Sequence, residues 1–210
     1  MSQPANRMLS SVARKLIMGV TGLMLVGFIV VHMVGNLQIF MGKSAFDAYA
    51  ENLHKVPGFP AIELGLLAIF VVHIATAISL VLDNRKARPV QYEQRVEQVT
   101  WASRMMAASG ILVLFFLVVH MKTLRFGEVD RVGAFQATVD VLKNPLFSLI
   151  YLVGVILIMP HLRHGIHSCF RSLGLTHEGH LKKLEQAASA IALLVTVGFA
   201  SIPVWVLVTK

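Results

Sequence analysis

The chain has 210 residues, of which 56% are hydrophobic and 14% are charged. Soluble domains carry about 25% charged residues, so this composition excludes a disordered chain, a nucleic-acid-binding arm and an ordinary soluble enzyme. In so apolar a chain, the net charge of +8 is typical of Lys and Arg in cytoplasmic loops that face anionic lipid. A single cysteine, Cys169, excludes a disulfide framework and a metal cluster built only from cysteines of this chain.

Five stretches are apolar over the length of about 20 residues that a helix needs to cross a bilayer. In chain order they cover about 16–40, 61–82, 101–121, 146–162 and 187–208. None alternates with the period of barrel strands, and the first is too long for a cleaved signal peptide. We therefore expect an all-α, polytopic membrane protein in which residues 1–210 form a single domain without internal repeats.

The distribution of basic residues predicts the orientation of these spans. With the N-terminus in the cytoplasm, the inner segments hold twelve Lys and Arg residues and the outer segments hold seven. We therefore expect a cytoplasmic N-terminus and a C-terminus outside. The polar segments at about 83–100 and 172–186 then face the cytoplasm, either as solvated connectors or as a docking surface for a soluble partner.

Four of the nine histidines fall inside the expected spans, one in each of the first four: His32, His73, His120 and His161. At a rise of 1.5 Å per residue, His32 and His120 lie near the outer ends of their helices. His73 and His161 lie nearer the cytoplasm. The two levels are about 15 Å apart, which is enough for two macrocycles, one above the other.

Ionisable side chains inside a membrane usually face the bundle interior and mark a functional path. A neutral imidazole is a good ligand for haem iron, and two per iron fill both axial positions, which suits electron transfer. Small residues would give the rings room: Gly19, Gly22, Gly27, Gly35, Ala75, Ser109, Gly110 and Gly154. The alternative is that each histidine only hydrogen-bonds a neighbouring helix. Zinc fits less well, because it prefers a compact tetrahedral cluster.

Several other polar residues are candidates for contacts with a bound haem. The segment HLRHGIH offers His161, His164 and His167, and depth favours His161 as the ligand. His164 is then a candidate contact for a haem propionate. Arg14 and Arg104 are candidates for the same contact by charge pairing, although each also fits an anchor that extends to the membrane surface.

Three segments, in this order, carry a resemblance to a known family: RKLIMGVTGLMLVGFIVVHMVGNLQIF, SRMMAASGILVLFFLVVH and HLRHG. Together with the position of His73, they resemble the five-helix, di-haem cytochrome b anchor subunit of bacterial succinate dehydrogenases and fumarate reductases. The resemblance extends over nearly the whole chain. It implies a bundle that encloses two stacked haem b groups, with His32 and His120 as distal ligands and His73 and His161 as proximal ligands.

The resemblance also implies the partners and the reaction. The chain would sit in the bacterial cytoplasmic membrane and carry electrons between an iron–sulfur subunit and a membrane quinone, either menaquinone or ubiquinone. A flavoprotein subunit with FAD would hold the succinate or fumarate site, so this chain would be enzymatic only as the quinone-reactive subunit. The soluble subunits would dock on the cytoplasmic face. The resemblance does not determine whether the whole complex forms oligomers.

Two positions depart from the family pattern. His54 stands where some members carry a glutamate implicated in quinone chemistry. A histidine can also exchange a proton, so His54 is a candidate for the quinone site, and the alternative is a solvated loop histidine. Met159 stands where some fumarate reductases carry a proton-conducting glutamate, and methionine cannot carry a proton, so the resemblance does not extend to a transmembrane proton path here.

Two other functions also fit the pattern. One is the cytochrome b of another respiratory complex, such as a hydrogenase or formate dehydrogenase, although those often place two ligands on one helix. The other is a haem-free transporter with a histidine-lined path, which predicts inverted repeats or broken helices. Pro160 and Pro203 lie near the ends of the expected helices, so the sequence does not indicate broken helices.

Overall fold

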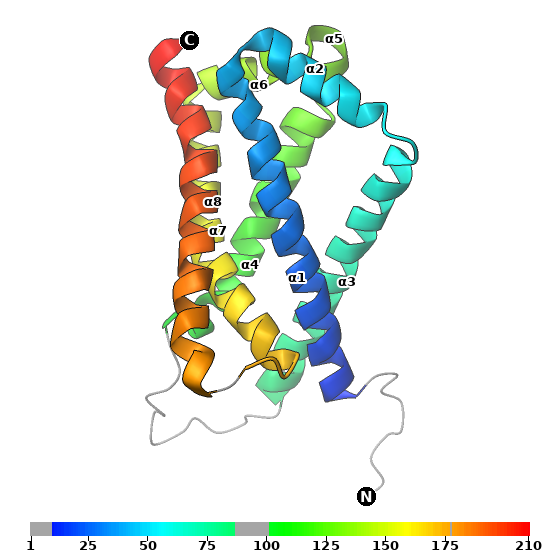
Figure 1. Ribbon diagram of the computed structural model, residues 1–210, viewed down its shortest axis with the longest axis vertical. Coiled ribbons are helices and arrows are strands. Elements are labelled where there is room, and N and C mark those ends of the chain that lie inside the picture. The colour runs from blue at the N-terminus through cyan, green and yellow to red at the C-terminus, as the bar shows by residue number, and fades with distance from the viewer. Residues whose placement is uncertain (1–9, 87–100, 177) are drawn as a thin grey trace, which may run out of the picture.

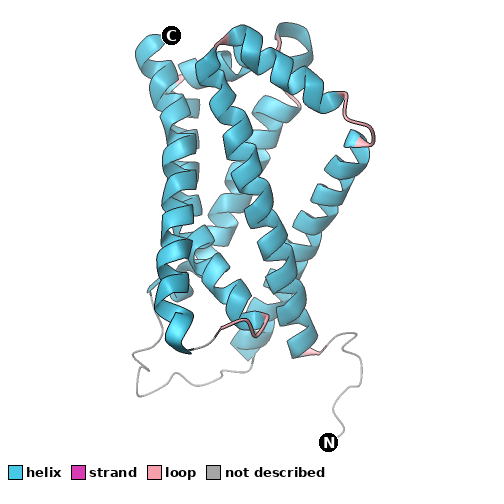
Figure 2. Cartoon of the chain, in the orientation of Figure 1, coloured by secondary structure: helices cyan, strands magenta, loops and turns pink. Residues whose placement is uncertain are grey.

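The protein is built from five long apolar helices whose axes all lie roughly along the length of the molecule (Figure 1). The computed structural model describes residues 10–86, 101–176 and 178–210, and in these ranges all regular structure is helical (Figure 2). The long helices are α1 (Ser11–Asn36), α3 (Phe59–Lys86), α4 (Trp101–His120), α7 (Pro145–Ser172) and α8 (Leu181–Thr209). The chain therefore has five candidate membrane spans, which confirms the all-α, five-span expectation.

The distribution of side chains is the reverse of that in a soluble bundle. Large apolar residues are exposed on all five long helices, among them Val31, Leu64, Ile111, Leu149 and Leu194. The buried residues include five with hydroxyl groups: Thr21, Ser109, Thr138, Ser148 and Thr196. Lipid can cover the apolar outer surface, whereas polar groups find partners only between helices.

Helix α7 lies at the centre of the packing. It contacts α8, α4 and α1, and α1 also packs against α3. Small residues of α8 allow close approach, because Ala188 and Ala192 are fully buried against Ile158, Leu162 and Ile166 of α7. Helix α1 begins at one end of the bundle and α8 ends at the other, as an odd number of crossings requires (Figure 1). Which end faces the cytoplasm stays a prediction.

Two helices are longer than the sequence pattern indicated. Helix α7 continues to Ser172 rather than ending near 162, and α8 begins at Leu181 rather than near 187. Polar residues extend both helices because their backbone hydrogen bonds continue past the apolar stretch. The placement of Pro160 near a helix end was therefore wrong, since it lies inside α7. The helix nevertheless continues through this proline, and it is not broken.

Three short helices, which the sequence analysis did not predict, lie across one end of the bundle (Figure 1). They are α2 (Lys43–His54), α5 (Val129–Val132) and α6 (Ala134–Lys143). Helix α6 is amphipathic, and its apolar face forms a cluster with residues of the long helices: Phe135, Val139, Leu142, Tyr151, Ile202 and Val206. These helices are too short to span a bilayer, so a search for apolar spans does not detect them.

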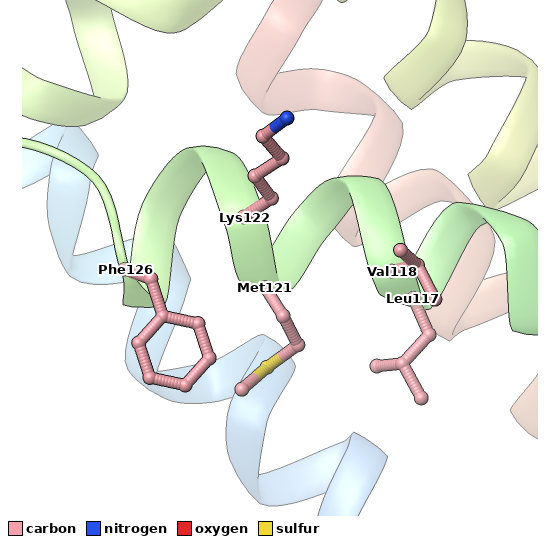
Figure 3. A pocket seen from close by; sticks show the side chains of 5 residues that line it. All are labelled: Leu117, Val118, Met121, Lys122 and Phe126. Carbon is pink, nitrogen blue, oxygen red and sulfur yellow. The ribbon is translucent and has the colours of Figure 1, made fainter.

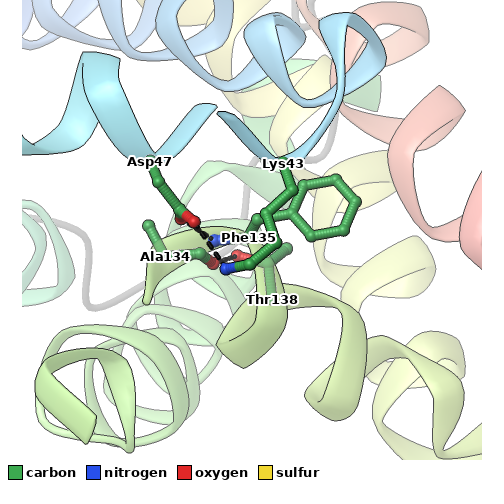
Figure 4. Close-up of polar contacts among 5 residues, drawn as sticks. All are labelled: Lys43, Asp47, Ala134, Phe135 and Thr138. Atoms are coloured by element: carbon green, nitrogen blue, oxygen red, sulfur yellow. Dashed lines mark hydrogen bonds and ion pairs between the residues drawn. The ribbon is translucent and has the colours of Figure 1, made fainter. Parts of the chain in front are cut away.

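Helices α2 and α6 are joined by Asp47 (Figure 4). Its Oδ1 accepts a hydrogen bond from the backbone N–H of Phe135 at 2.8 Å, and the Lys43 ammonium donates to its Oδ2 at 2.7 Å. Partial burial raises the pKa of the Asp47 carboxyl, but these two hydrogen bonds and the Lys43 charge outweigh that effect and hold the pKa below its ordinary value of 3.8. The two helices begin after glycines with positive φ, Gly42 at 95° and Gly133 at 87°, which L side chains rarely adopt.

Candidate functional site

The outer pair of histidines, His32 of α1 and His120 of α4, lies side by side between the helices. Their ring centroids are 5.8 Å apart and their planes are nearly perpendicular. One helical turn before each histidine, an aromatic ring lies against it: Phe28 is 5.2 Å from His32, and Phe116 is 6.0 Å from His120. Tyr151 of α7 lies 5.9 Å from the His120 ring. The outer pair is therefore enclosed by aromatic side chains.

The geometry of the outer pair fits a metal ion with two axial imidazoles. An ion about 2 Å from one nitrogen of each ring would hold the two centroids roughly 6 Å apart. The Nδ1 atom of His120 is buried and has no hydrogen-bond partner among the described residues. Burying an unpaired ring nitrogen is costly, and a bound ligand or a metal removes that cost. A π-helical turn, Met121–Arg125, follows His120 directly, and such turns are frequent at functional sites.

The inner pair, His73 of α3 and His161 of α7, lies nearer the other end of the bundle. The two histidines are close enough to interact electrostatically. Each has a hydroxyl group from a neighbouring helix at its Nδ1. The Oγ1 of Thr21 on α1 is 3.1 Å from the Nδ1 of His73, and the Oγ of Ser109 on α4 is 3.3 Å from the Nδ1 of His161.

Glycines leave space beside both rings of the inner pair. A Cβ atom added at Gly22 would lie 3.4 Å from Cε1 of His73, and one at Gly110 would lie 3.5 Å from Cε1 of His161. Other glycines that we expected beside the rings lie elsewhere. Gly27 faces open space, while Gly35 and Gly154 pack against aromatic rings of other segments.

The two pairs occupy two depths. Gly22 precedes His32 by ten residues on α1, and Gly110 precedes His120 by ten residues on α4. Ten residues of helix rise by about 15 Å, so the inner pair lies about that far below the outer pair. The structure thus brings together the residues that the sequence grouped by depth. Their role as ligands stays a prediction.

Of the three candidates for propionate contacts, Arg14 has other polar partners in the structure. The Arg14 guanidinium forms an ion pair with Asp83 at 2.6 Å and also hydrogen-bonds Ser79, which ties α1 to α3. His164 is half-buried on α7. The side chain of Arg104 lies outside what the structure describes, as do residues 87–100 of the expected cytoplasmic loop.

His54 is the last residue of α2, so the expectation of a loop histidine was wrong. Its Nδ1 is 2.7 Å from the carbonyl oxygen of Ala50, and its ring lies 4.9 Å from Phe59. A carbonyl oxygen can only accept, so Nδ1 carries the proton and donates. Among the described residues Nε2 of this exposed ring has no hydrogen-bond partner, so it remains available as an acceptor.

Sequence reasoning missed two features of the polar network. Thr21 was not recognised as a partner of His73, because a hydroxyl 52 positions away in sequence gives no local signal. The second is Glu63, which accepts two hydrogen bonds from Arg125 at 3.0 and 3.1 Å, 62 positions away in sequence. In the part of the chain that the structure describes, no three metal-ligating side chains converge, so the histidines form two-residue sites.

A hollow elsewhere on the surface carries no argument for the site. It is lined by residues at the end of α4 and in the following turn: Leu117, Val118, Met121, Lys122 and Phe126. The apolar side chains Leu117, Met121 and Phe126 project from one side of the helix, and Lys122 projects the other way (Figure 3). No histidine lines this hollow, and its apolar surface suits contact with lipid.

The fold and these two sites define a polytopic helical membrane protein with two pairs of histidines at two depths. The chain is similar to the succinate dehydrogenase cytochrome b558 subunit of Bacillus subtilis (strain 168). The two are 24% identical over 152 residues, which cover 71% of this chain and 73% of that subunit. This distant relationship confirms the resemblance drawn from the sequence segments. No family model matches the chain, and no solved structure matches it.

Proposed function

We propose that the chain is the membrane-anchor cytochrome b subunit of a succinate:quinone oxidoreductase. The observation that carries this proposal is the outer pair, whose ring separation of 5.8 Å and unpartnered His120 Nδ1 fit a buried bis-imidazole centre. The inner pair about 15 Å away and the distant relative named as a cytochrome of succinate dehydrogenase support it.

Two haem b groups are the proposed cofactors, one held by His32 and His120 and the other by His73 and His161. When bound, haem supplies a centre that takes up and releases single electrons. The protein would contribute the two imidazoles of each pair as iron ligands, which would leave no position on the iron for oxygen. Apolar helices exclude water from both levels. Gly22 of α1 and Gly110 of α4 let the two rings of the inner pair pack closely against these helices.

The proposed partners are an iron–sulfur subunit and a flavoprotein subunit, which would hold the site for succinate. They would dock at the end of the bundle where α1 begins, α7 ends and α8 begins (Figure 1). Exposed basic side chains gather on these helix ends: Lys15, Arg171, Lys182 and Lys183. Under the proposed orientation this end faces the cytoplasm, as the distribution of positive charge predicts.

We place the candidate quinone site at the opposite end, near His54. The free Nε2 of this residue can accept a hydrogen bond or a proton, and the exposed ring can exchange that proton with water. Reduction of a quinone requires two protons as well as two electrons, so a group of this kind must stand near the quinone. Menaquinone and ubiquinone both meet this description.

The experiment that tests the proposal is a haem and flavin analysis of the purified complex. We expect about two bis-histidine haem b groups per chain, together with FAD and iron–sulfur clusters from the partners. His32→Ala and His73→Ala should each remove one haem and leave the other. A haem-free preparation with full quinone activity would refute the proposal. Co-purification with hydrogenase or formate dehydrogenase subunits would assign the chain to another respiratory complex.

A further inference from the structure

The hydroxyl groups beside the inner pair have a role that the proposed function does not by itself assign. We propose that Thr21 and Ser109 are positioning residues for His73 and His161. Each hydroxyl oxygen accepts a hydrogen bond from the Nδ1–H of its histidine, which leaves Nε2 of that ring as the ligand atom. This inference rests on the proposed function, because it concerns how the inner pair presents itself to a haem iron.

The direction of these hydrogen bonds follows from the other contacts of each hydroxyl. A hydroxyl has one proton to donate. The Thr21 hydroxyl donates it to the carbonyl oxygen of Ile17, 2.7 Å away on its own helix. The oxygen 3.1 Å from His73 Nδ1 is then available only as an acceptor, so Nδ1 must carry the ring proton.

The same argument applies to the other half of the inner pair. The Ser109 hydroxyl donates to the carbonyl oxygen of Met106 at 3.1 Å, and it meets His161 Nδ1 at 3.3 Å. Both hydroxyl residues are buried, with 8% of Thr21 and 5% of Ser109 exposed. Both hydroxyl groups are therefore shielded from solvent by the surrounding helices.

The two arrangements repeat along the chain. His73 follows Thr21 by 52 positions, and His161 follows Ser109 by 52 positions. Each hydroxyl residue is followed directly by the glycine that leaves space beside the ring, Gly22 or Gly110. The outer-pair histidine follows that glycine by ten positions in both helices. The expectation of a chain without repeats was therefore wrong at the level of these positions.

The repeat is parallel rather than inverted. Helices α1 and α4 run in one direction, and α3 and α7 run in the other (Figure 1). Parallel repeats are related by an axis along the membrane normal. A hydroxyl group that recurs at the same place in both halves, aimed at the same ring atom, indicates a requirement of the site rather than a chance contact.

A hydrogen bond at the ring nitrogen that does not bind the metal fixes the orientation of a ligating histidine and raises the basicity of the ring. A more basic imidazole stabilises the oxidised iron relative to the reduced iron. Loss of either hydroxyl should therefore raise the reduction potential of the inner haem. Loss of a residue that hydrogen-bonds a metal ligand also typically weakens metal binding about 10–100-fold. The outer pair has no such hydroxyl among the described residues, so its haem should not respond.

The test is a redox titration of the purified complex, combined with electron paramagnetic resonance of the oxidised haems. His73→Ala first identifies which haem component belongs to the inner pair. We expect Thr21→Val and Ser109→Ala to shift the potential and the low-spin signal of that component only. The variants Thr21→Ser and Ser109→Thr keep the hydroxyl and should restore both. If Thr21→Val does not assemble, Thr21→Ala removes the same hydroxyl with less steric change.

Matched controls come from hydroxyl residues whose hydrogen bonds, within the described part of the chain, stay in their own helix. Thr196→Val is buried in α8, where its hydroxyl donates to Ala192, and Ser201→Ala removes a bond to Gly198. Equal shifts in these controls, or unchanged potentials and signals in both inner variants, would overturn the inference. A wild-type complex without bis-histidine haem would overturn the proposed function itself, and the two failures are therefore distinguishable.

Discussion

The close packing of α1 beside His73 can be tested by adding a methyl group at Gly22. An added Cβ at Gly22 would lie 2.9 Å from the Sγ of Cys169 on α7, which is closer than real Cβ atoms come to a neighbouring atom. Only 6% of Cys169 is exposed, so its thiol has little room to move. The Gly22→Ala substitution should therefore force α1 and α7 apart or rotate the Cys169 side chain.

The expected cost follows from overpacking and helix propensity. Inserting a methyl group into a well-packed interior costs about 1–3 kcal/mol, and replacing glycine by alanine within a helix returns roughly 0.5–1 kcal/mol. For a chain of 210 residues, a net loss of about 1–2 kcal/mol lowers the melting temperature by roughly 2–8 °C. Gly27→Ala is the matched control, because nothing lies within 4 Å of that added Cβ.

The assay is thermal unfolding of the detergent-solubilised complex, followed by far-UV circular dichroism. Gly22→Ala should melt below the wild type, and Gly27→Ala should melt at or above it. The double variant Gly22→Ala/Cys169→Ala removes the clash and should show a favourable coupling energy of about 0.5–3 kcal/mol. Equal melting temperatures for the two glycine variants, or the absence of coupling with Cys169, would refute the packing argument.

Three further predictions concern the end of the bundle where α2 and α6 lie. Because the folded-state pKa of Asp47 lies below 3.8, its ionised form stabilises the fold above about pH 4, and this stability is lost as the pH falls through the folded pKa. Asp47→Asn should therefore flatten the acid side of the melting-temperature profile, and an unchanged profile would contradict this. Gly42→Ala should cost about 1–3 kcal/mol, because φ of 95° and ψ of 174° suit only glycine, whereas Gly65→Ala in α3 should not destabilise the protein in the same melting assay. Replacing Glu63 by Gln should cost only about 0.2–1 kcal/mol, since its ion pair with Arg125 is partly exposed, and a denaturation loss several times larger would show that the pair is buried in the complex.

Much of the fold was predictable from the sequence, because a long apolar stretch has few alternatives to a membrane helix. The grouping of His32 with His120 was also predictable, since a constant rise per residue converts sequence position into depth. The short helices at one end were not, because α6 is stabilised by contacts of Phe135 and Leu142 with distant parts of the chain. A helix of this length offers only about two or three turns of apolar periodicity in the sequence, which is too little to predict it without those contacts.

The hydroxyl partners of the inner pair show a different limit. Thr21 and Ser109 are small polar residues in apolar helices, and each also bonds its own helix, so neither stands out locally. Only the structure joins them to His73 and His161. Once these contacts are known, the equal spacing of 52 positions between hydroxyl residue and histidine is visible in the sequence. The same spacing could be searched for in other chains.

The bond between Asp47 and Phe135 has a consequence for biogenesis. It joins residues 88 positions apart, and a ribosome adds about 5–20 residues per second. Helix α2 therefore emerges roughly 4–18 seconds before α6 exists to meet it. During that interval two spans, α3 and α4, must cross the membrane while α2 waits at the surface without its partner. The hydrogen bond between Asp47 and Phe135 therefore forms late, and it closes this end of the bundle only after α3 and α4 have been inserted.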